Sequence, residues 1–234
     1  MKVNAIIMAA GMGTRLKPIT DTTPKPLVKV HGVPMIENII ENLKACGVND
    51  ISIVVGYLAQ KFDYLKEKYK VNIILNKDYI EANNISSLYY AREELRNTII
   101  IDGDQIIKNN NIIKTDFIHS GYVCWWDDEF SSEWMLHLDE NNKIVECFRN
   151  GSEKAWELKG LSFWTEEDSK KLKQYLIKQY KELNNKEIYW DDIAMFNYKE
   201  KFDLYGYKIN KEDIIEIDGL NDLIKIDSSY KRRI

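Results

Sequence analysis

The fold of this 234-residue chain is decided near its N-terminus, by the stretch Val3-Asn4-Ala5-Ile6-Ile7-Met8-Ala9-Ala10-Gly11-Met12-Gly13-Thr14-Arg15-Leu16. Residues 3–8 are mostly apolar and partly β-branched, which predicts a buried strand. The glycines that follow predict a loop, and glycine lets main-chain N–H groups approach an anion closely. The stretch therefore predicts an α/β protein with a phosphate-binding loop after its first strand.

The loop matches neither of the two common phosphate-binding motifs. The chain contains no G-x-x-x-x-G-K-[ST] spacing, and the dinucleotide motif requires a third glycine where Leu16 stands. Arg15 and Lys25 place two cations near the loop, and the prolines, all between residues 18 and 34, stiffen the path that returns Lys25 to it. A plain surface turn with two solvated basic residues is the alternative, but the buried strand before the loop favours a triphosphate site.

Apolar runs and helical periodicities alternate in the first hundred residues. The predicted strands are 3–8, 51–55, 71–75 and 98–101, and the predicted helices are 35–43, 58–69 and 86–95. Such alternation predicts a doubly wound, mostly parallel sheet with helices on both faces. Strand-like segments at 121–126, 133–138, 143–149 and 158–164 then predict a small antiparallel excursion. A helix opening at Thr165, with Asp168 in a capping-box position, and a strand at 213–217 before a closing helix complete the α/β fold.

The amino-acid composition excludes several classes of protein. With 44% hydrophobic residues the chain can bury the core of one domain, and a net charge of −4 argues against duplex nucleic acid as a partner. The three cysteines show no C-x-x-C spacing, so we expect neither a disulfide framework nor a zinc site. No apolar run approaches the ~20 residues of a membrane span, and the N-terminus does not resemble a signal peptide. We expect a soluble, cytoplasmic protein without a membrane partner.

At Ala9 to Leu16 and Pro24-Lys25 the chain resembles the nucleotidyltransferase family, whose signature is AAG-x-G-[ST]-R-L followed by P-K. It is most similar to the bacterial CTP:phosphocholine cytidylyltransferases, over nearly its whole length. Segments 54–57, 62–69, 83–89, 133–134, 160–164, 189–191 and 216–218 carry that similarity. The resemblance implies a Rossmann-like α/β/α fold and the transfer of a cytidylyl group from CTP to phosphocholine, with CDP-choline and pyrophosphate as products. It also implies Mg²⁺ as the cofactor.

We expect a single domain over 1–234. Residues 1–120 mainly bind the nucleotide, 121–200 mainly bind the acceptor, and 201–234 form the closing strand and helix. Whether two chains pair as a homodimer is left open by the sequence.

Two acidic strand ends are candidates for the metal. The strand at 98–101 ends in Asp102-Gly103-Asp104, and the late strand ends in Glu216-Ile217-Asp218. Open α/β sheets bind ligands at this edge, and Mg²⁺ takes carboxylate oxygens. A plain Asp-Gly turn is the alternative. The resemblance assigns the metal to Asp104 and Asp218 and leaves the roles of Asp102 and Glu216 open.

The resemblance also assigns residues to the nucleotide. They are Ala10, Gly11, Met12, Gly13, Thr14, Arg15, Lys25, Tyr57, Asn83, Asn84, Ser87 and Asp104, of which Lys25, Arg15 and Asp104 are assigned to catalysis. The main chain of 11–14 and Arg15 would hold the β- and γ-phosphates, and Lys25 would bridge the α-phosphate and the attacking phosphate. Asn83, Asn84 and Ser87 would contact the base, although Asn84 or Ser86 could instead cap a helix.

The acceptor is expected near the aromatic residues of the second half, where all six tryptophans lie. A quaternary ammonium is recognised by aromatic faces beside a carboxylate. The resemblance assigns this pocket to Glu133, Trp134, Tyr189, Trp190 and Asp191, with Trp164 as a further wall, and leaves the role of Asp192 open. The remaining alternatives are 2-aminoethylphosphonate, phosphoethanolamine or a sugar phosphate as acceptor, and a nucleotide-sensing domain without catalysis.

Overall fold

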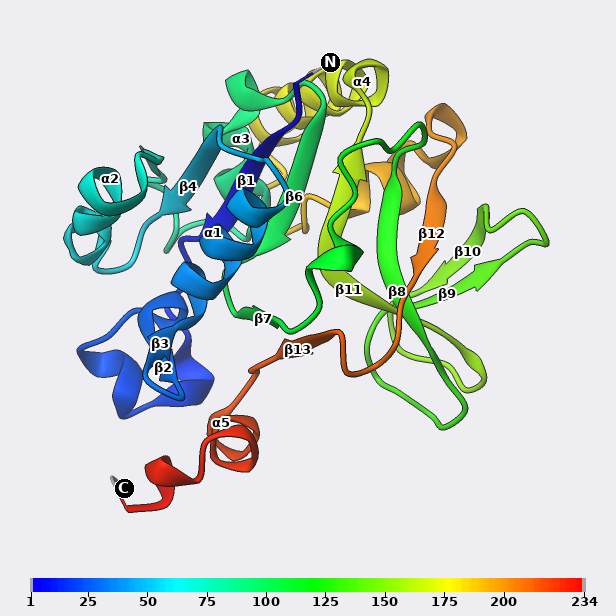
Figure 1. The fold of residues 1–234 in the computed structure, drawn as a ribbon. Helices are drawn as coiled ribbons and strands as arrows, with labels where there is room; N and C mark the ends of the chain where they lie inside the picture. The colour runs from blue at the N-terminus through cyan, green and yellow to red at the C-terminus, as the bar shows by residue number, and fades with distance from the viewer. Residues whose placement is uncertain (1, 233–234) are drawn as a thin grey trace.

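Strand β1 (Asn4–Ala9) lies at the centre of a nine-stranded sheet in the computed structural model, which describes residues 2–232 (Figure 1). It pairs in parallel with β4 (Ile51–Val55) on one side and with β6 (Thr98–Asp102) on the other. Strand β5 (Asn72–Leu75) continues the parallel part beyond β4. Every residue of β1 is buried, as expected for a strand that is covered on both faces.

Successive side chains of β1 contribute to two different hydrophobic layers. Ile7 packs in the layer that holds the first two helices, whereas Ile6 packs in the layer of the next two. These helices are α1 (Met35–Ala45) and α2 (Tyr64–Tyr69) on one face, and α3 (Ile85–Tyr90) and α4 (Glu166–Leu176) on the other. The prediction of a doubly wound, mostly parallel α/β sheet with helices on both faces is therefore confirmed.

The antiparallel strands continue this sheet. Strand β11 (Ala155–Trp164) pairs with β6 in antiparallel fashion and so joins the two parts. The neighbouring strands are β8 (Gly121–Asp127), β9 (Met135–Leu138), β10 (Ile144–Phe148) and β12 (Tyr205–Lys208). Strand β12 was not predicted, because it is four residues long and contains a glycine, and only its parallel pairing with β8 makes it a strand.

A separate two-stranded ladder lies below the main sheet in the view of Figure 1. Strand β7 (Gln105–Ile107) pairs with β13 (Ile214–Glu216), so that Gln105 lies opposite Glu216. The short ladder of β2 (Lys29–Val30) and β3 (Val33–Pro34) precedes α1, and α5 (Leu220–Ile226) follows β13. Because β7 follows Asp104 and β13 precedes Asp218, their pairing brings two distant acidic segments together.

Two predicted helices are shorter than expected. Only 64–69 of the predicted helix 58–69 is α-helical, because Leu58 has a left-handed φ of 49° and the chain first makes a 3₁₀ turn over Ala59–Phe62. The helix predicted over 86–95 ends at Tyr90 and is followed by another 3₁₀ turn, Arg92–Glu94.

Helix α4 begins after Thr165, as predicted. Thr165 accepts a hydrogen bond from the N–H of Asp168 at 3.3 Å, which is one half of a capping box. The other half is absent, because the N–H of Thr165 donates to the hydroxyl of Ser120 instead. A π-helical segment, Ile177–Glu182, extends the helix further.

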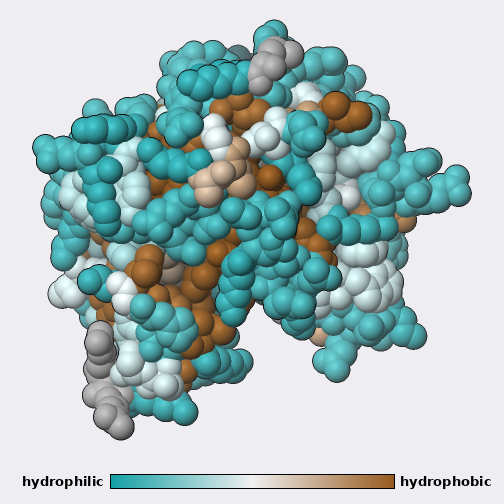
Figure 2. All heavy atoms as spheres, in the orientation of Figure 1, coloured by the Kyte–Doolittle hydropathy of each residue, from teal (hydrophilic) through white to brown (hydrophobic). Residues whose placement is uncertain are grey.

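The surface in Figure 2 is mostly hydrophilic and is indented at its lower edge, between the part of the molecule that carries α5 and the antiparallel part. All three cysteines are free thiols. Within residues 2–232, we find no helix with the length and apolarity required to traverse a bilayer.

Candidate active site

Two neighbouring cavities open at the carboxyl ends of β1 and β6. Ligands of open α/β sheets bind where the strand order reverses, and here β1 lies between β4 and β6, which follow it in the chain. The glycine-loop cavity, of about 390 Å³, is lined by residues of the loop after β1, by Lys25 and by Asp104. The aromatic cavity, of about 220 Å³, is lined by Trp134, Trp190 and other residues of the antiparallel part. Three residues line both cavities: Asn84, Asp102 and Tyr189.

Gly13 allows Lys25 to lie against the loop. Its φ is +61°, and a Cβ atom at this position would lie 2.7 Å from the Cβ of Lys25, so no larger residue fits without movement. The hydroxyl of Thr20 donates to the carbonyl of Gly13 at 2.9 Å and fixes the loop from the other side. The chain between the loop and Lys25 is therefore folded back on itself, as the prolines suggested.

Two residues assigned to the nucleotide do not line the cavity. The hydroxyl of Tyr57 donates to the carbonyl of Thr20 at 2.9 Å, and its N–H donates to the carbonyl of Ala10 at 3.1 Å. Tyr57 thus braces the loop from outside. Met12 is 42% exposed and lies outside the cavity lining, because the loop turns its side chain toward solvent. The side chains of Tyr57 and Met12 therefore do not line the glycine-loop cavity, whereas the expectation for Met12 concerns its main-chain N–H and is unaffected.

Lys25 and Arg15 lie against carboxylates. The Nζ atom of Lys25 is 2.6 Å from Oδ2 of Asp104 and 3.7 Å from Oδ1 of Asp218. Arg15 reaches Oδ1 of Asp218 at 2.6 Å, but its side chain is 70% exposed whereas that of Lys25 is 10% exposed. Lys25 is therefore held rigidly inside the site, and Arg15 lies at its entrance.

Three carboxylates converge beside Lys25. Asp104, Glu216 and Asp218 each place an oxygen within 4.8 Å of the other two. The Oδ1 atom of Asp104 is buried and has no hydrogen-bond partner among residues 2–232. Burial, followed by the charges of Asp104 and Asp218, raises the pKa of Glu216 to about 7. A hard divalent cation would satisfy the unused oxygen and offset this repulsion, so the cluster fits Mg²⁺.

Glu216 joins the cluster although its role was left open by the sequence. The available signal was its spacing from Asp218, since alternate residues of an extended segment point to the same side. The pairing of β13 with β7 sets Glu216 opposite Gln105 and so brings both side chains close to Asp104.

The segment Asn83, Asn84 and Ser87 lines the glycine-loop cavity as expected. Asn84 also accepts a hydrogen bond from the N–H of Trp190 at 3.0 Å, and Asn83 donates to the carbonyl of Glu187 at 3.1 Å. The side chain of Asn84 makes no capping bond to α3. This segment therefore ties the glycine-loop cavity to the segment that carries Tyr189 and Trp190.

The aromatic cavity combines ring faces with a buried carboxylate. The rings of Trp134 and Tyr189 meet edge to face, with centroids 5.8 Å apart. Trp190 is buried and stacks on Tyr122 at 6.1 Å. Burial raises the pKa of Asp191 to about 7, and exposed Glu133 lines the same cavity. The cavity thus presents aromatic surface and negative charge to any ligand that enters it.

Trp164 does not form a wall of this cavity, which corrects the expectation from the sequence. Its side chain is fully buried, and its indole N–H donates to the hydroxyl of Ser162 at 3.0 Å. The ring packs edge to face behind Trp190, with centroids 5.7 Å apart. The position of Trp164 on β11, which pairs with β6 in the centre of the sheet, directs the side chain into the core.

Asp192 supports the cavity from behind. Asp192 is 1% exposed, and its Oδ1 atom forms an ion pair with Nη2 of Arg149 at 2.5 Å. The guanidinium of Arg149 lies 5.6 Å from the ring centroid of Trp134 and 4.0 Å from that of Phe196. Asp192 therefore holds a cation that packs against the outer side of Trp134.

The sequence analysis did not identify Tyr122 and Lys159 as site residues. Tyr122, on β8, is buried and lines the aromatic cavity. Lys159, on β11, also lines this cavity, and its Nζ atom lies 3.8 Å from Oε2 of Glu216. The next residue, Gly160, leaves space for Asp102, since a Cβ atom there would lie 2.3 Å from its Oδ2. No motif marks these residues, because only the pairing of β11 with β6 and β8 brings them to the cavity.

Known proteins resemble this chain in sequence and in fold. The sequence model of the family described as Nucleotidyl transferase matches residues 4–117. The chain is 39% identical to a choline-phosphate cytidylyltransferase of Streptococcus pneumoniae over 98% of this chain and 99% of that one. It is also 39% identical to a 2-aminoethylphosphonate cytidylyltransferase of Lancefieldella rimae over 98% of this chain and 94% of that one. The solved structure of a CTP:phosphocholine cytidylyltransferase from Streptococcus pneumoniae superposes with a TM-score of 0.92 at 38% identity, over 98% of this chain and 100% of that one.

Proposed function

Because the chain belongs to the nucleotidyl transferase family, we propose that it transfers the cytidylyl group of CTP to phosphocholine, giving CDP-choline and pyrophosphate. A phosphate oxygen of the acceptor attacks the α-phosphorus of CTP, and the bond from that phosphorus to pyrophosphate breaks. One observation carries the proposal: the glycine-loop cavity and the aromatic cavity meet at Asp102, Asn84 and Tyr189. A nucleotide in the first cavity and an acceptor in the second would be neighbours.

The glycine-loop cavity suits the triphosphate and the base of CTP. The main-chain N–H groups of 11–14 and the guanidinium of Arg15 supply donors and positive charge for the β- and γ-phosphates. Asn83, Asn84 and Ser87 supply amide and hydroxyl groups for the base at the other end of the cavity.

Lys25 supplies the charge where the reacting phosphates meet. Both reactants are anions, so the protein must align them and offset their repulsion rather than provide a nucleophile. The ammonium of Lys25 is nearly buried at the junction with the acidic cluster, where it can donate to the α-phosphate and to the attacking phosphate. Lys159 brings a second cation to the aromatic cavity, on the side of Glu216.

We assign the Mg²⁺ site to Asp104 and Asp218, with Glu216 as a third oxygen donor. Such an ion, when bound, offsets negative charge at the reacting phosphate. The ion pairs from Lys25 hold the carboxylates of Asp104 and Asp218 on either side of one ammonium group.

The aromatic cavity suits a quaternary ammonium. Such a group cannot donate a hydrogen bond, so it is bound by ring faces and by unpaired negative charge. Trp134, Tyr189 and Trp190 provide the rings, and Asp191 and Glu133 provide the carboxylates.

A second candidate acceptor is 2-aminoethylphosphonate, which we retain because a relative of equal identity is named for it. The carboxylates of Asp191 and Glu133 could accept hydrogen bonds from its primary ammonium. The test is a matrix of CTP, UTP, dTTP and ATP against phosphocholine, 2-aminoethylphosphonate, phosphoethanolamine and glucose 1-phosphate, with pyrophosphate release as the readout. The highest kcat/KM is expected for CTP with phosphocholine. A preference for a sugar phosphate, or the absence of turnover with every pair, would refute the proposed activity.

Replacement of Trp134 should weaken acceptor binding selectively. The Trp134→Ala enzyme is expected to show a KM for phosphocholine raised about tenfold or more, since a desolvated cation–π contact contributes about 2 kcal/mol. The KM for CTP should change by less than about twofold, because Trp134 does not line the glycine-loop cavity. Phe130→Ala, which removes an exposed ring that lines neither cavity, serves as the control. An equal rise in both KM values would contradict the assignment.

Asp191 should make acceptor binding dependent on pH. Since its pKa is raised to about 7, its carboxylate is charged above this pH and neutral below it. The kcat/KM for phosphocholine is therefore expected to fall as the pH is lowered from 8 to 6, more steeply than the kcat/KM for CTP. In Asp191→Asn, kcat/KM for phosphocholine should be about tenfold lower at pH 8. The variant should also lose the part of the pH dependence that distinguishes the two substrates; an unchanged difference would exclude Asp191.

A further inference from the structure

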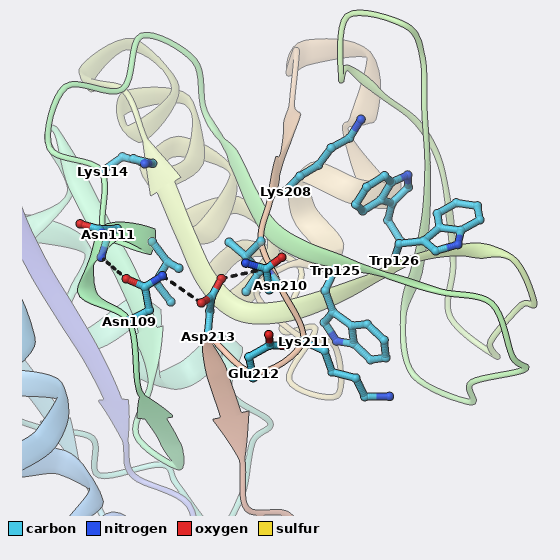
Figure 3. A pocket seen from close by; sticks show the side chains of 13 residues that line it. Asn109, Asn111, Lys114, Trp125, Trp126, Lys208, Asn210, Lys211, Glu212 and Asp213 are labelled. Atoms are coloured by element: carbon cyan, nitrogen blue, oxygen red, sulfur yellow. Dashed lines mark hydrogen bonds between the residues drawn. The ribbon is translucent and has the colours of Figure 1, made fainter.

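A third cavity, which we call the outer cavity, lies on the antiparallel part of the molecule and shares no lining residue with the two cavities of the active site (Figure 3). Its volume is about 550 Å³, and it lies at the end of β8, where β12 stops pairing with it. We propose that the outer cavity binds a small organic phosphate that carries a flat ring, of which a nucleotide is the representative class.

Positive charge is concentrated at this cavity. Lys114, Lys208 and Lys211 line it, and none of them has a carboxylate within 4.0 Å among residues 2–232. Lys114 and Lys208 also line an adjoining cavity, so both reach the boundary between the two. Figure 3 shows these lysines on different sides of the cavity, so in a chain with a net charge of −4 they give its rim a local positive charge that favours an anion.

One of the two carboxylates in the outer cavity is already engaged. Asp213 accepts a hydrogen bond from the amide of Asn109 at 2.9 Å and another from the N–H of Asn210 at 2.9 Å (dashed lines in Figure 3). These two hydrogen bonds orient the carboxylate oxygens of Asp213 toward Asn109 and Asn210. Glu212 is the other acidic residue, so the three lysines outnumber the carboxylates that could neutralise them.

Aromatic rings stand beside Lys208. The side chain of Trp126 is 42% exposed and lies edge to face against Trp156, with ring centroids 5.4 Å apart. The Nζ atom of Lys208 lies 4.5 Å from the ring centroid of Trp156, the ring against which Trp126 packs. An exposed indole beside unpaired ammonium groups matches a ligand with a flat ring at one end and a phosphate at the other.

The test follows the six indole N–H signals of the ¹⁵N-labelled enzyme by NMR, assigned with single Trp→Phe variants. The probe is CMP, and cytidine, ribose 5-phosphate and inorganic phosphate are titrated separately. CMP is expected to shift the signals of Trp126 and Trp156 saturably, with an affinity about tenfold higher than that of each fragment. Shifts at Trp190, whose main-chain N–H donates to Asn84 of the glycine-loop cavity, report the active site in the same titration and so separate the two events.

The double variant Lys114→Ala/Lys208→Ala should weaken CMP binding at Trp126 and Trp156 about tenfold or more, since each lysine offers a charge-assisted hydrogen bond. Shifts at Trp134 and Trp190 should be unchanged, as should kcat/KM for CTP. Lys66→Ala/Lys170→Ala removes the same charge from exposed sites elsewhere and should leave binding as in the wild type. The proposal is overturned if CMP shifts only the active-site tryptophans or if the double variant keeps its affinity. Equal affinity for ribose 5-phosphate and CMP would overturn the ring contact.

Discussion

Lys25→Ala is expected to lower kcat about a thousandfold in a pyrophosphate-release assay. Its ammonium is the one cation of the glycine-loop cavity whose side chain is nearly buried, at 10% exposed, and it lies 2.6 Å from Asp104. A preorganised donor at the reacting group contributes a factor of about 10² to 10³ in rate, and a charged donor in a dry site lies at the upper end. Circular dichroism should show an intact fold, because the loop that carries Lys25 lies outside the central sheet.

Two further variants test whether the loss of kcat is specific to the ammonium group of Lys25. Lys17→Ala removes an exposed lysine from the same loop, where it pairs only with Asp21, and should leave kcat within about twofold of the wild type. Lys25→Arg keeps the charge, but the planar guanidinium is larger than the ammonium that lies between Asp104 and Asp218 in a side chain only 10% exposed, so most of the rate should still be lost. Turnover within tenfold of the wild type in Lys25→Ala would remove Lys25 from the mechanism.

Asp104→Asn is expected to reduce activity by about three orders of magnitude, together with the affinity for the divalent cation. The substitution keeps the shape of the side chain but removes the negative charge that faces Lys25, Glu216 and Asp218. Stabilisation of phosphate charge by a metal ion contributes several kcal/mol, which corresponds to this factor in rate. Activity should be measured as a function of Mg²⁺ concentration, and binding should be measured independently with Mn²⁺.

The binding measurement separates two explanations of the loss. If Asp104 holds the metal, Mn²⁺ affinity should fall about tenfold or more, and Asp218→Asn should behave similarly. If Asp104 only positions Lys25, turnover should be lost while Mn²⁺ affinity stays the same, and the metal assignment would be wrong. Asp63→Asn, at an exposed residue paired with Lys66 on the far side of the sheet, is the control with the same change of charge.

Local sequence patterns predicted most of the parallel part of the fold. Strand β1 and the loop after it could be recognised because a buried apolar run ends abruptly in glycines, and these features act within a few residues. Helix α1 likewise shows its buried face in the spacing of its own apolar residues. Strand β12 lacked such a signal, because its stability comes from pairing with β8. The lengths of the helices before β5 and β6 were also wrong, since short 3₁₀ turns have no distinct periodicity.

The candidate site shows the same division. The glycine loop, Lys25 and the acidic strand ends could be assigned from the sequence, because each is a short motif whose chemistry does not depend on its neighbours. The approach of Glu216 and Asp218 to Asp104 is a consequence of the ladder between β7 and β13.

The sequence by itself determined that this protein has a strand, a glycine loop and a lysine returning to that loop, because adjacent residues specify these features through backbone freedom and charge. Only the tertiary structure decided which side chains line the two cavities. The register of β11 against β6 and β8 buries Trp164 in the core and directs Lys159 and Tyr122 to the aromatic cavity. Strand pairing between distant segments has no local signature, so a tryptophan that forms the core and one that lines a cavity cannot be distinguished until the sheet is assembled.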